Sequence, residues 1–430
     1  MSLAAPTIAP DQVATSAERR IYYGWVNLLM ASVAMTATLP GRTHGLGLIT
    51  RPLTEDTALN VSEALFSQLN FWAVLIGTAI CLPVGKAIDR FGVRQVLTAV
   101  AVVLGLSVAG LSQATNWIWL LVTLTLVRGF GQGALSVVSM AMIGKWFTRR
   151  LGMAMGLFSV LLAIGFINTT VGTGYAVSTY GWRVTWLAIA ACLVFGLAPL
   201  GWLIVRSSPE AMGLSVDLAG DIKESVDEVP LDLPVSGALR SPAFWVFTLA
   251  AAMFNLTWSA ITLFQESLLV ERGFNHDSFI LVMGLLVAAG LPANLLTGWL
   301  ATPRRIGAIL AFGMLVLAGS LVAFPWMTTN TQLMYYGTAL GVSGGIITVI
   351  FFSAFGQAFG RTHLGAIQAI VQVVSVLASA AGPILLTGSR SYASTSLFFY
   401  VAAAFAIVLA GLAIVLKLPS RKMTPEPGMT

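Results

Sequence analysis

The fold is decided by residues 39–45, which read Leu39-Pro40-Gly41-Arg42-Thr43-His44-Gly45 and lie inside the first long apolar run. A charged side chain at membrane depth is costly, and it serves as a rule in a substrate path, an ion relay or a charge pair. Pro40 and Gly41 loosen the helix just before this charge, and broken helices in membranes line cavities rather than face lipid. We therefore interpret Arg42 as the anion-binding group of a transport pathway and His44 as its neighbour.

The composition of the whole chain indicates a membrane protein. Hydrophobic residues make up 57% of the 430 residues and charged residues only 9%, whereas charged residues are about 25% of an ordinary soluble domain. This balance excludes a soluble globule. The net charge of +6 does not indicate a nucleic-acid partner, because the few basic residues lie at the ends of apolar runs.

Twelve apolar runs are long enough to cross a membrane, which takes about 20 residues. They cover residues 22–49, 64–84, 95–113, 117–144, 152–175, 183–205, 243–268, 279–300, 306–325, 332–356, 365–388 and 396–417. We expect an all-α polytopic protein with an N-terminal tail (1–20), a six-helix bundle (21–205), a central loop (206–241), a second six-helix bundle (242–418) and a C-terminal tail (419–430).

The distribution of lysine and arginine predicts the orientation of the chain. With the N-terminus inside, fourteen of these residues lie near span ends on the inner side and four on the outer side. Cytoplasmic loops carry the excess of basic residues in membrane proteins. The sequence therefore predicts a multi-pass protein of the plasma (inner) membrane with both termini in the cytoplasm.

Three short matches, at an offset near 212 residues, relate the two halves of the chain. Residues 85–90, 128–133 and 147–154 match residues 298–303, 340–345 and 359–366, respectively. Such a repeat predicts two pseudo-symmetric bundles that rock about a site at mid-membrane between them. Asn255 lies 213 residues after Arg42, so we expect it to form a second pole of that site.

The loop between spans two and three reads Gly85-Lys86-Ala87-Ile88-Asp89-Arg90-Phe91-Gly92-Val93-Arg94 and resembles the signature loop of the major facilitator superfamily. Arg128-Gly129-Phe130-Gly131-Gln132-Gly133 in span four resembles the arginine–glycine motif of the same superfamily. The resemblance implies the major facilitator fold. Asp89 can cap or pair with a neighbouring helix end, and Arg128 either polarises a proton relay or bonds backbone carbonyls. As a conformational gate we expect Gly85, Asp89, Arg90, Arg94, Arg128 and Arg149, although a plain positive-inside loop also accounts for the charges.

Four further stretches resemble the monocarboxylate porter family and its bacterial oxalate/formate-type relatives. They are residues 21–26, 145–156, 180–183 and 208–214. The resemblance implies a basic residue in the outer half of span one, where Arg42 lies, and an arginine there presents a two-pronged donor that suits a carboxylate. The family also places an Asp and an Arg in span eight, but residues 287–293 carry no charge here.

His44 can replace that missing pair, because a histidine titrates near neutral pH. Two residues along a regular helix are about 200° apart, so Arg42 and His44 share one cavity only if Pro40 and Gly41 relax the helix. Glu266 is the one acid inside a span, and it either couples protons or lies at headgroup level.

Other polar side chains at membrane depth complete the expected site. Asn255, Trp258, Asn70 and Gln372 are candidates for binding the substrate, and each can instead bond a neighbouring helix. No phosphate-cradling loop with a lysine, no metal-ligand cluster and no serine–histidine–acid set is present in the sequence. We therefore expect no enzyme, no cofactor and no nucleotide partner.

The sequence predicts secondary transport of a small organic anion, a monocarboxylate, coupled to protons or exchanged for another anion. The expected partners are that anion, protons and the lipid bilayer, and the expected state is a monomer. Two alternatives stay open, an exporter of amphipathic compounds and a transporter-like solute receptor. A receptor would need a folded signalling module, for which the central loop is too short.

Overall fold

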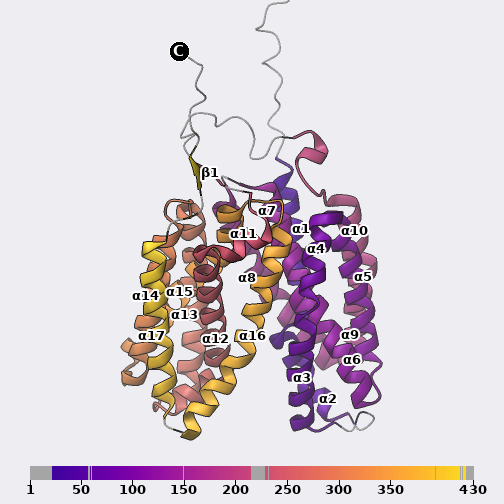
Figure 1. The fold of residues 1–430 in the computed structure, drawn as a ribbon. Coiled ribbons are helices and arrows are strands. Elements are labelled where there is room, and N and C mark those ends of the chain that lie inside the picture. Colours follow the sequence, from indigo (N-terminus) through magenta and orange to yellow (C-terminus); the bar gives the residue numbers. More distant parts are fainter. Residues whose placement is uncertain are drawn as a thin grey trace, which may run out of the picture.

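A computed structural model shows how these spans are arranged (Figure 1). It describes residues 22–56, 59, 61–148, 150–214, 228–230, 232–392, 394–416, 418 and 420–422. Within these residues, eleven helical segments are long and apolar enough to cross a membrane, and Gly24–Thr36 is a shorter apolar helix. Eleven of the twelve predicted spans are thus found as spanning helices, and the first predicted span is divided into shorter helical pieces.

The N-terminal half contains six spans, four of which are interrupted or irregular. Its elements are α1 (Gly24–Thr36), η2 (Leu39–Gly41), α2 (Thr43–Thr54), α3 (Glu63–Thr78), α4 (Cys81–Phe91), α5 (Val93–Ser112), α6 (Trp117–Val127), η3 (Arg128–Leu135), α7 (Ser136–Trp146), α8 (Leu151–Tyr180), α9 (Trp182–Ala191), η4 (Cys192–Leu197) and α10 (Ala198–Ile204). Of these, η2 is a short 3₁₀ helix, whereas η3 and η4 are π-helical. π-Helical turns inside α-helices are rare and occur often at functional sites.

The C-terminal half has longer, uninterrupted helices. It consists of α12 (Pro242–Val270), α13 (His276–Leu300), α14 (Ile306–Ala323), η6 (Phe324–Trp326), α15 (Asn330–Phe359), α16 (Leu364–Tyr392) and α17 (Thr395–Val415). The connecting segment carries η5 (Glu210–Met212), β1 (Glu228–Pro230) and α11 (Val235–Arg240). After α17, β2 (Ser420–Lys422) pairs antiparallel with β1.

Helices in the two halves begin at matched positions that lie 213 residues apart. This holds for Glu63 and His276 (α3, α13), Val93 and Ile306 (α5, α14), Leu151 and Leu364 (α8, α16), and Trp182 and Thr395 (α9, α17). The internal repeat predicted from three short matches is therefore present in the helix register. The first span of each half departs from it, because α1 begins at Gly24 and α12 at Pro242.

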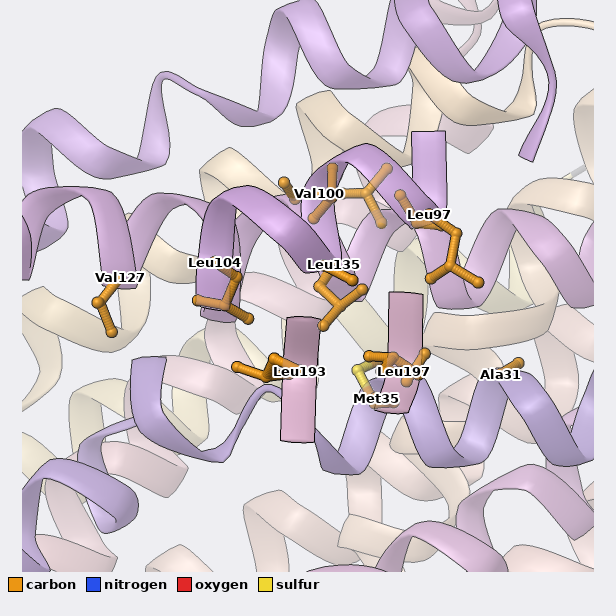
Figure 2. Packing of buried hydrophobic residues seen from close by; sticks show 14 of the residues in the cluster. Ala31, Met35, Leu97, Val100, Leu104, Val127, Leu135, Leu193 and Leu197 are labelled. Carbon is orange, nitrogen blue, oxygen red and sulfur yellow. The ribbon is translucent and has the colours of Figure 1, made fainter. Parts of the chain in front are cut away.

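Buried apolar side chains form one cluster in each half. The first includes Ala31, Met35, Leu97, Leu104 and Leu135, which converge from α1, α5 and η3 (Figure 2). The second is built from helices α11 to α17. In a membrane, helices associate through close packing rather than through the expulsion of water, so small residues mark the contacts.

The halves meet at the end of the bundle where α1 begins and α17 ends, which we call the terminal face (upper end in Figure 1). There, a Cβ atom added to Gly85 of α4 would lie 2.6 Å from the carbonyl oxygen of Gly365 in α16. One added to Gly156 of α8 would lie 3.0 Å from the Cα atom of Gly298 in α13. Backbone thus lies against backbone across both contacts.

Candidate functional site

The first span is broken at the position where the sequence carries Pro40 and Gly41. Helix α1 ends at Thr36, η2 forms a single tight turn, and Arg42 follows with extended backbone angles (φ −96°, ψ 155°) before α2 begins. Proline lacks an amide proton and disfavours helical geometry in the residue before it. Arg42 therefore stands outside any regular helix, at the N-cap position of α2.

The guanidinium of Arg42 is held by neutral groups. Its Nε atom donates to Thr38 Oγ1 at 2.7 Å, and Nη2 donates to Ser136 Oγ at 3.1 Å and to Met35 Sδ at 3.2 Å. The guanidinium also lies 5.1 Å from the ring centroid of Phe166. In the part of the chain that the structure describes, no carboxylate pairs with it. The positive charge is thus positioned but not neutralised.

Arg128 secures the break from the opposite side. This side chain is only 3% exposed, and its Nη1 atom donates to the carbonyl oxygen of Gly41 at 3.1 Å and to Gln132 Oε1 at 3.0 Å. Asn70 Oδ1 accepts from Nη2 at 2.6 Å and from Nε at 3.0 Å. The sequence allowed Arg128 either to polarise a proton relay or to bond backbone carbonyls. In the structure it bonds a backbone carbonyl and neighbouring side chains. Asn70, a candidate for substrate binding, lies against Arg128.

Close backbone contact accompanies these hydrogen bonds. A Cβ atom added to Gly41 would lie 2.5 Å from the carbonyl oxygen of Val127 and 2.9 Å from the Cα atom of Gly131. Only glycine fits there, because a side chain would collide with the backbone of η3. The broken turn of span one and the π-helical turn of span four therefore form one docked unit.

His44 and Arg42 contact the same aromatic ring despite their spacing. His44 is exposed, and its ring meets Phe166 edge-on at 5.2 Å with an interplanar angle of 90°. Because Arg42 precedes the start of α2, the 200° separation of a regular helix does not apply to this pair. The two side chains thus both contact one phenylalanine of α8.

A cavity of about 160 Å³ lies between the two halves. The N-terminal half contributes Met35, Arg42, Gln132, Ser136, Met140, Leu162 and Phe166, and the C-terminal half contributes Ala251, Phe254, Asn255, Ile347, Thr348, Phe351, Phe352, Gln372, Ser375, Val376 and Ser379. Apart from Arg42, the lining consists of neutral polar and apolar side chains. The cavity is thus a pocket lined by polar and apolar groups in similar measure, with Arg42 as the one cation among its lining residues.

Two candidates from the C-terminal half lie on this cavity and one lies beside it. Asn255 lines it, with its amide nitrogen donating to the carbonyl oxygen of Ala251 at 2.8 Å. Gln372 also lines it and donates across the two halves to the carbonyl oxygen of Gln132 at 3.2 Å. Trp258 packs on Phe254 with ring centroids 5.4 Å apart and is not among the lining residues.

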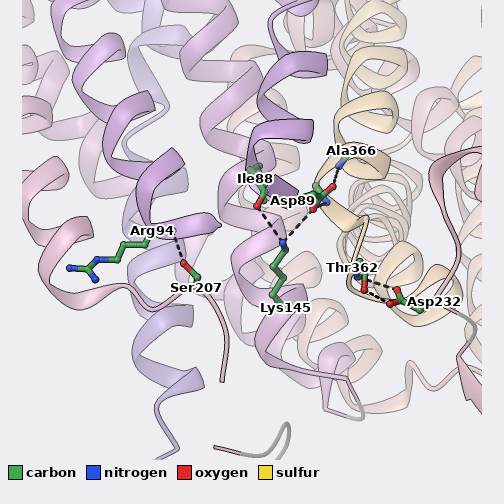
Figure 3. Close-up of polar contacts among 9 residues, drawn as sticks. Ile88, Asp89, Arg94, Lys145, Ser207, Asp232, Thr362 and Ala366 are labelled. Atoms are coloured by element: carbon green, nitrogen blue, oxygen red, sulfur yellow. Dashed lines mark hydrogen bonds and ion pairs between the residues drawn. The ribbon is translucent and has the colours of Figure 1, made fainter. Parts of the chain in front are cut away.

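Asp89 joins the halves at the terminal face (Figure 3). Its Oδ1 accepts from the backbone N–H of Gly365 at 3.1 Å, and its Oδ2 accepts from that of Ala366 at 2.9 Å, in the first turn of α16. Lys145 Nζ lies 3.3 Å from Asp89 Oδ1. A carboxylate is favoured at a helix N-terminus, where N–H groups lack partners and the helix dipole is positive. The cap predicted for Asp89 is therefore observed, and it crosses from one half to the other.

Arg94 and Arg90, two of the remaining gate candidates, make their described contacts elsewhere. Arg94 donates from Nε to the carbonyl oxygen of Trp202 at 2.6 Å, within its own half. Arg90 lies over the ring of its neighbour Phe91 at 5.3 Å. Arg149 and the side chain of Glu266 lie outside the described residues.

A second cross-half contact at the terminal face went unpredicted. Arg361 donates from Nη1 to the carbonyl oxygen of Lys145 at 2.6 Å and pairs with Glu210 at 2.7 Å. Partial burial raises the pKa of Glu210, but hydrogen bonds from Arg361, from its own backbone and from Ser208 outweigh this effect, so the pKa lies below its ordinary value. Ser136, Phe166 and Ser375 were also missed, since small or apolar residues within apolar runs carry no sequence signal.

Two helical bundles that enclose a cavity with a single cation define a membrane transport protein. Residues 21–383 match the family described as Major Facilitator Superfamily, and the chain therefore belongs to that superfamily.

Individual relatives are distant. Monocarboxylate transporter 13 of Rattus norvegicus is 23% identical, with 81% of this chain and 79% of the relative covered. The agnestins efflux protein of Paecilomyces divaricatus is 22% identical, covering 83% and 78%. The crystal structure of the human organic anion transporter MFSD10 (TETRAN) shares the fold, with a TM-score of 0.64 at 15% identity over 92% of this chain and 99% of that one.

Proposed function

We propose that this protein is a secondary transporter of a small organic anion, a monocarboxylate, and that Arg42 binds the carboxylate. The observation that carries the proposal is an arginine on the cavity between the halves whose described partners are all neutral. A guanidinium matches a carboxylate in shape, and such charge-assisted hydrogen bonds are stronger than neutral ones. One cation favours one negative charge on the solute.

The size of the cavity supports a small solute. Pockets for drug-sized ligands measure about 300–1,000 Å³, and this cavity measures about 160 Å³. A large amphipathic compound would need a wider cavity than this one. The relatives named monocarboxylate transporters agree with a small acid, whereas the relative named as an efflux protein keeps export as the second candidate.

Alternating access would operate through the contacts at the terminal face. Asp89 and Arg361 each bond across the two halves at this face, and Gln372 does so at the cavity. Breaking these contacts would let the bundles rock and open the cavity toward that face. To bind a carboxylate, Arg42 must release neutral partners such as Thr38 and Ser136. Binding of the solute would therefore change contacts within the N-terminal bundle and favour this movement.

We place the terminal face in the cytoplasm of a plasma (inner) membrane, because basic residues concentrate there by the sequence count. The transport unit would be a monomer, since one chain supplies both walls of the cavity. Proton coupling would fall to His44, which shares the Phe166 ring with Arg42. Anion exchange would need no titrating group.

The test is uptake by proteoliposomes of labelled lactate, pyruvate, oxalate, formate, a sugar phosphate and a cationic dye, with and without an inward proton gradient. The proposal expects gradient-stimulated or exchange-driven uptake of a monocarboxylate. Uptake of the dye alone would favour export of amphipathic compounds and reject the anion. If protons are coupled through His44, His44→Gln should remove the gradient stimulation, and unchanged stimulation would exclude this histidine.

A further inference from the structure

One buried serine differs from every other buried serine that the structure describes. Eleven serines are buried, and ten of them take part in hydrogen bonds. Most donate to a carbonyl oxygen three or four residues back in their own helix, as Ser353 does to Val349 at 2.8 Å. The Oγ atom of Ser375 is buried and has no hydrogen-bond partner.

Ser375 lies on the wall of the cavity. The residue is 4% exposed and lines the same cavity as Arg42, from α16 in the opposite half. A buried hydroxyl without a partner loses its hydrogen bonds to water and gains none in return, which costs roughly 1–3 kcal/mol. A helical serine can avoid that cost by bonding its own backbone, so an unbonded hydroxyl on a cavity wall is available to whatever fills the cavity.

We infer that Ser375 is a specificity-determining residue, which bonds a second polar group of the solute while Arg42 binds its carboxylate. This inference rests on the proposed function and refines its substrate class. The hydroxyl of Ser375 can both donate and accept, so it suits a hydroxyl or carbonyl oxygen on the solute. Gln372, one turn earlier on α16, uses its amide nitrogen to bond Gln132 across the halves. Among the described residues that line the cavity, Ser375 is the one whose buried side-chain polar atom has no hydrogen-bond partner.

A buried hydroxyl on the cavity wall can discriminate between an acid that carries a hydroxyl and the analogue that lacks one. A site built to bond a hydroxyl rejects the analogue that lacks it, because the protein group is then left buried and unpaired. A cavity with only apolar groups opposite Arg42 would instead favour the plain acid. The two arrangements predict opposite orders for lactate and propionate, and likewise for β-hydroxybutyrate and butyrate.

The experiment measures initial uptake of both matched pairs by proteoliposomes that contain wild-type protein, Ser375→Ala or Ser353→Ala. Wild-type protein should prefer the hydroxy acid of at least one pair. Ser375→Ala should lower that preference by roughly threefold to tenfold, the effect of one neutral hydrogen bond. Ser353→Ala, a buried serine bonded within its own helix and away from the cavity lining, should leave the preference as it is.

Each other outcome rejects the inference. If Ser375→Ala lowers uptake of both acids of a pair equally, Ser375 either binds the carboxylate or is needed for folding. If the preference is unchanged in Ser375→Ala, the hydroxyl does not contact the solute. No preference in the wild-type protein would exclude a second polar pole while leaving the anion transporter intact. Uptake of none of the four acids would overturn the proposed function together with this inference.

Discussion

The two halves of the molecule share a helix register but differ in the first span. In the N-terminal half this span is broken into α1, η2 and α2, whereas in the C-terminal half α12 runs without interruption from Pro242 to Val270. The fourth span shows the same contrast, with the π-helical η3 in one half and the continuous α15 in the other. The broken turn η2 and the π-helical η3, which dock on each other, therefore both lie in the N-terminal half.

The residues at equivalent positions explain the contrast. At the offset of 213, Gly341 stands opposite Arg128 and Phe254 opposite Gly41. Gly341 has no side chain that could donate to a backbone carbonyl, as Arg128 does to Gly41. The side chain of Phe254 does not allow the close backbone approach that Gly41 makes to η3. The C-terminal half thus lacks both the hydrogen-bond donor and the space that such a break needs.

The difference teaches how the two halves divide the chemistry of one cavity. The broken half presents a cation, Arg42, and the regular half presents neutral side chains, among them Asn255, Gln372 and Ser375. A charge in an apolar span needs several hydrogen-bond partners, and the break supplies them at Thr38 and Ser136. A regular helix suffices for amides and hydroxyls.

The largest effect should come from closing the contact that Gly41 makes. Gly41→Ala would place a Cβ atom within 3 Å of the backbone of Val127 and Gly131, and overpacking of this kind costs about 1–3 kcal/mol or more. We expect a marked loss of folded protein in fluorescence-detected size-exclusion chromatography. Gly47→Ala, in open space on α2, should be neutral or stabilising because alanine favours a helix. Equal behaviour of the two variants would refute the docked break.

A smaller effect is expected from moving the cation to the other half. Arg42→Gln should abolish uptake of the anion, and Arg42→Gln combined with Asn255→Arg should restore part of it, since both positions line one cavity. Competition binding of the transported acid measures the recovery. Asn255→Gln in the same background provides the matched control without a charge. If Asn255→Arg does not restore binding in the Arg42→Gln background, positions 42 and 255 cannot both hold the cation that binds the acid.

The next effect in size is expected from Asp89, which joins the two halves at the terminal face. Asp89→Asn removes the charge that caps α16 and pairs with Lys145, and loss of a helix cap costs about 0.5–2 kcal/mol. We expect a lower melting temperature and greater reactivity of a cysteine introduced at Ala369, on the buried face beside Gly85. Arg90→Gln, next to the junction but bonded elsewhere, is the control. Identical reactivity in both variants would remove Asp89 from the gate.

The smallest effect concerns Glu210, which is half-exposed and paired with Arg361. Because the pKa of Glu210 in the folded protein lies below the ordinary 4.5, its contribution to stability is complete above pH 4.5 and is lost as the pH falls through the lowered value. Exposed ion pairs contribute about 0.2–1 kcal/mol. Melting temperatures of wild-type protein and Glu210→Gln should therefore differ slightly at pH 7 and converge only as the pH falls below the lowered pKa of Glu210. A difference that grows on acidification would contradict the sign.

Much of this arrangement was predictable from the sequence. Long apolar runs predicted the spans, short matches predicted the repeat, and a charge beside Pro40 and Gly41 predicted that Arg42 would lie on a cavity. The acid of the loop between spans two and three predicted a helix cap at Asp89.

What could not be predicted are contacts between distant spans. Nothing in the sequence shows that Arg128 bonds the carbonyl oxygen of Gly41, or that Asn70 lies against Arg128, because both depend on how spans one, two and four pack. Ser375 escaped notice for a similar reason. A serine in an apolar helix is unremarkable until the neighbours of its hydroxyl are known.

The most direct measurement of the central claim is the initial rate of lactate uptake by proteoliposomes containing equal amounts of wild-type protein, Arg42→Gln or Arg51→Gln. Arg51 lies on α2, the helix that Arg42 precedes, where it is exposed and paired with Glu55. Because Arg51 does not line the cavity, Arg51→Gln tests the loss of a positive charge away from the proposed site. Charged hydrogen bonds contribute about 1.5–3 kcal/mol, and the account therefore predicts at least about a tenfold loss for Arg42→Gln and none for Arg51→Gln. Lactate uptake by Arg42→Gln at the wild-type rate would contradict the assignment of Arg42 as the anion site.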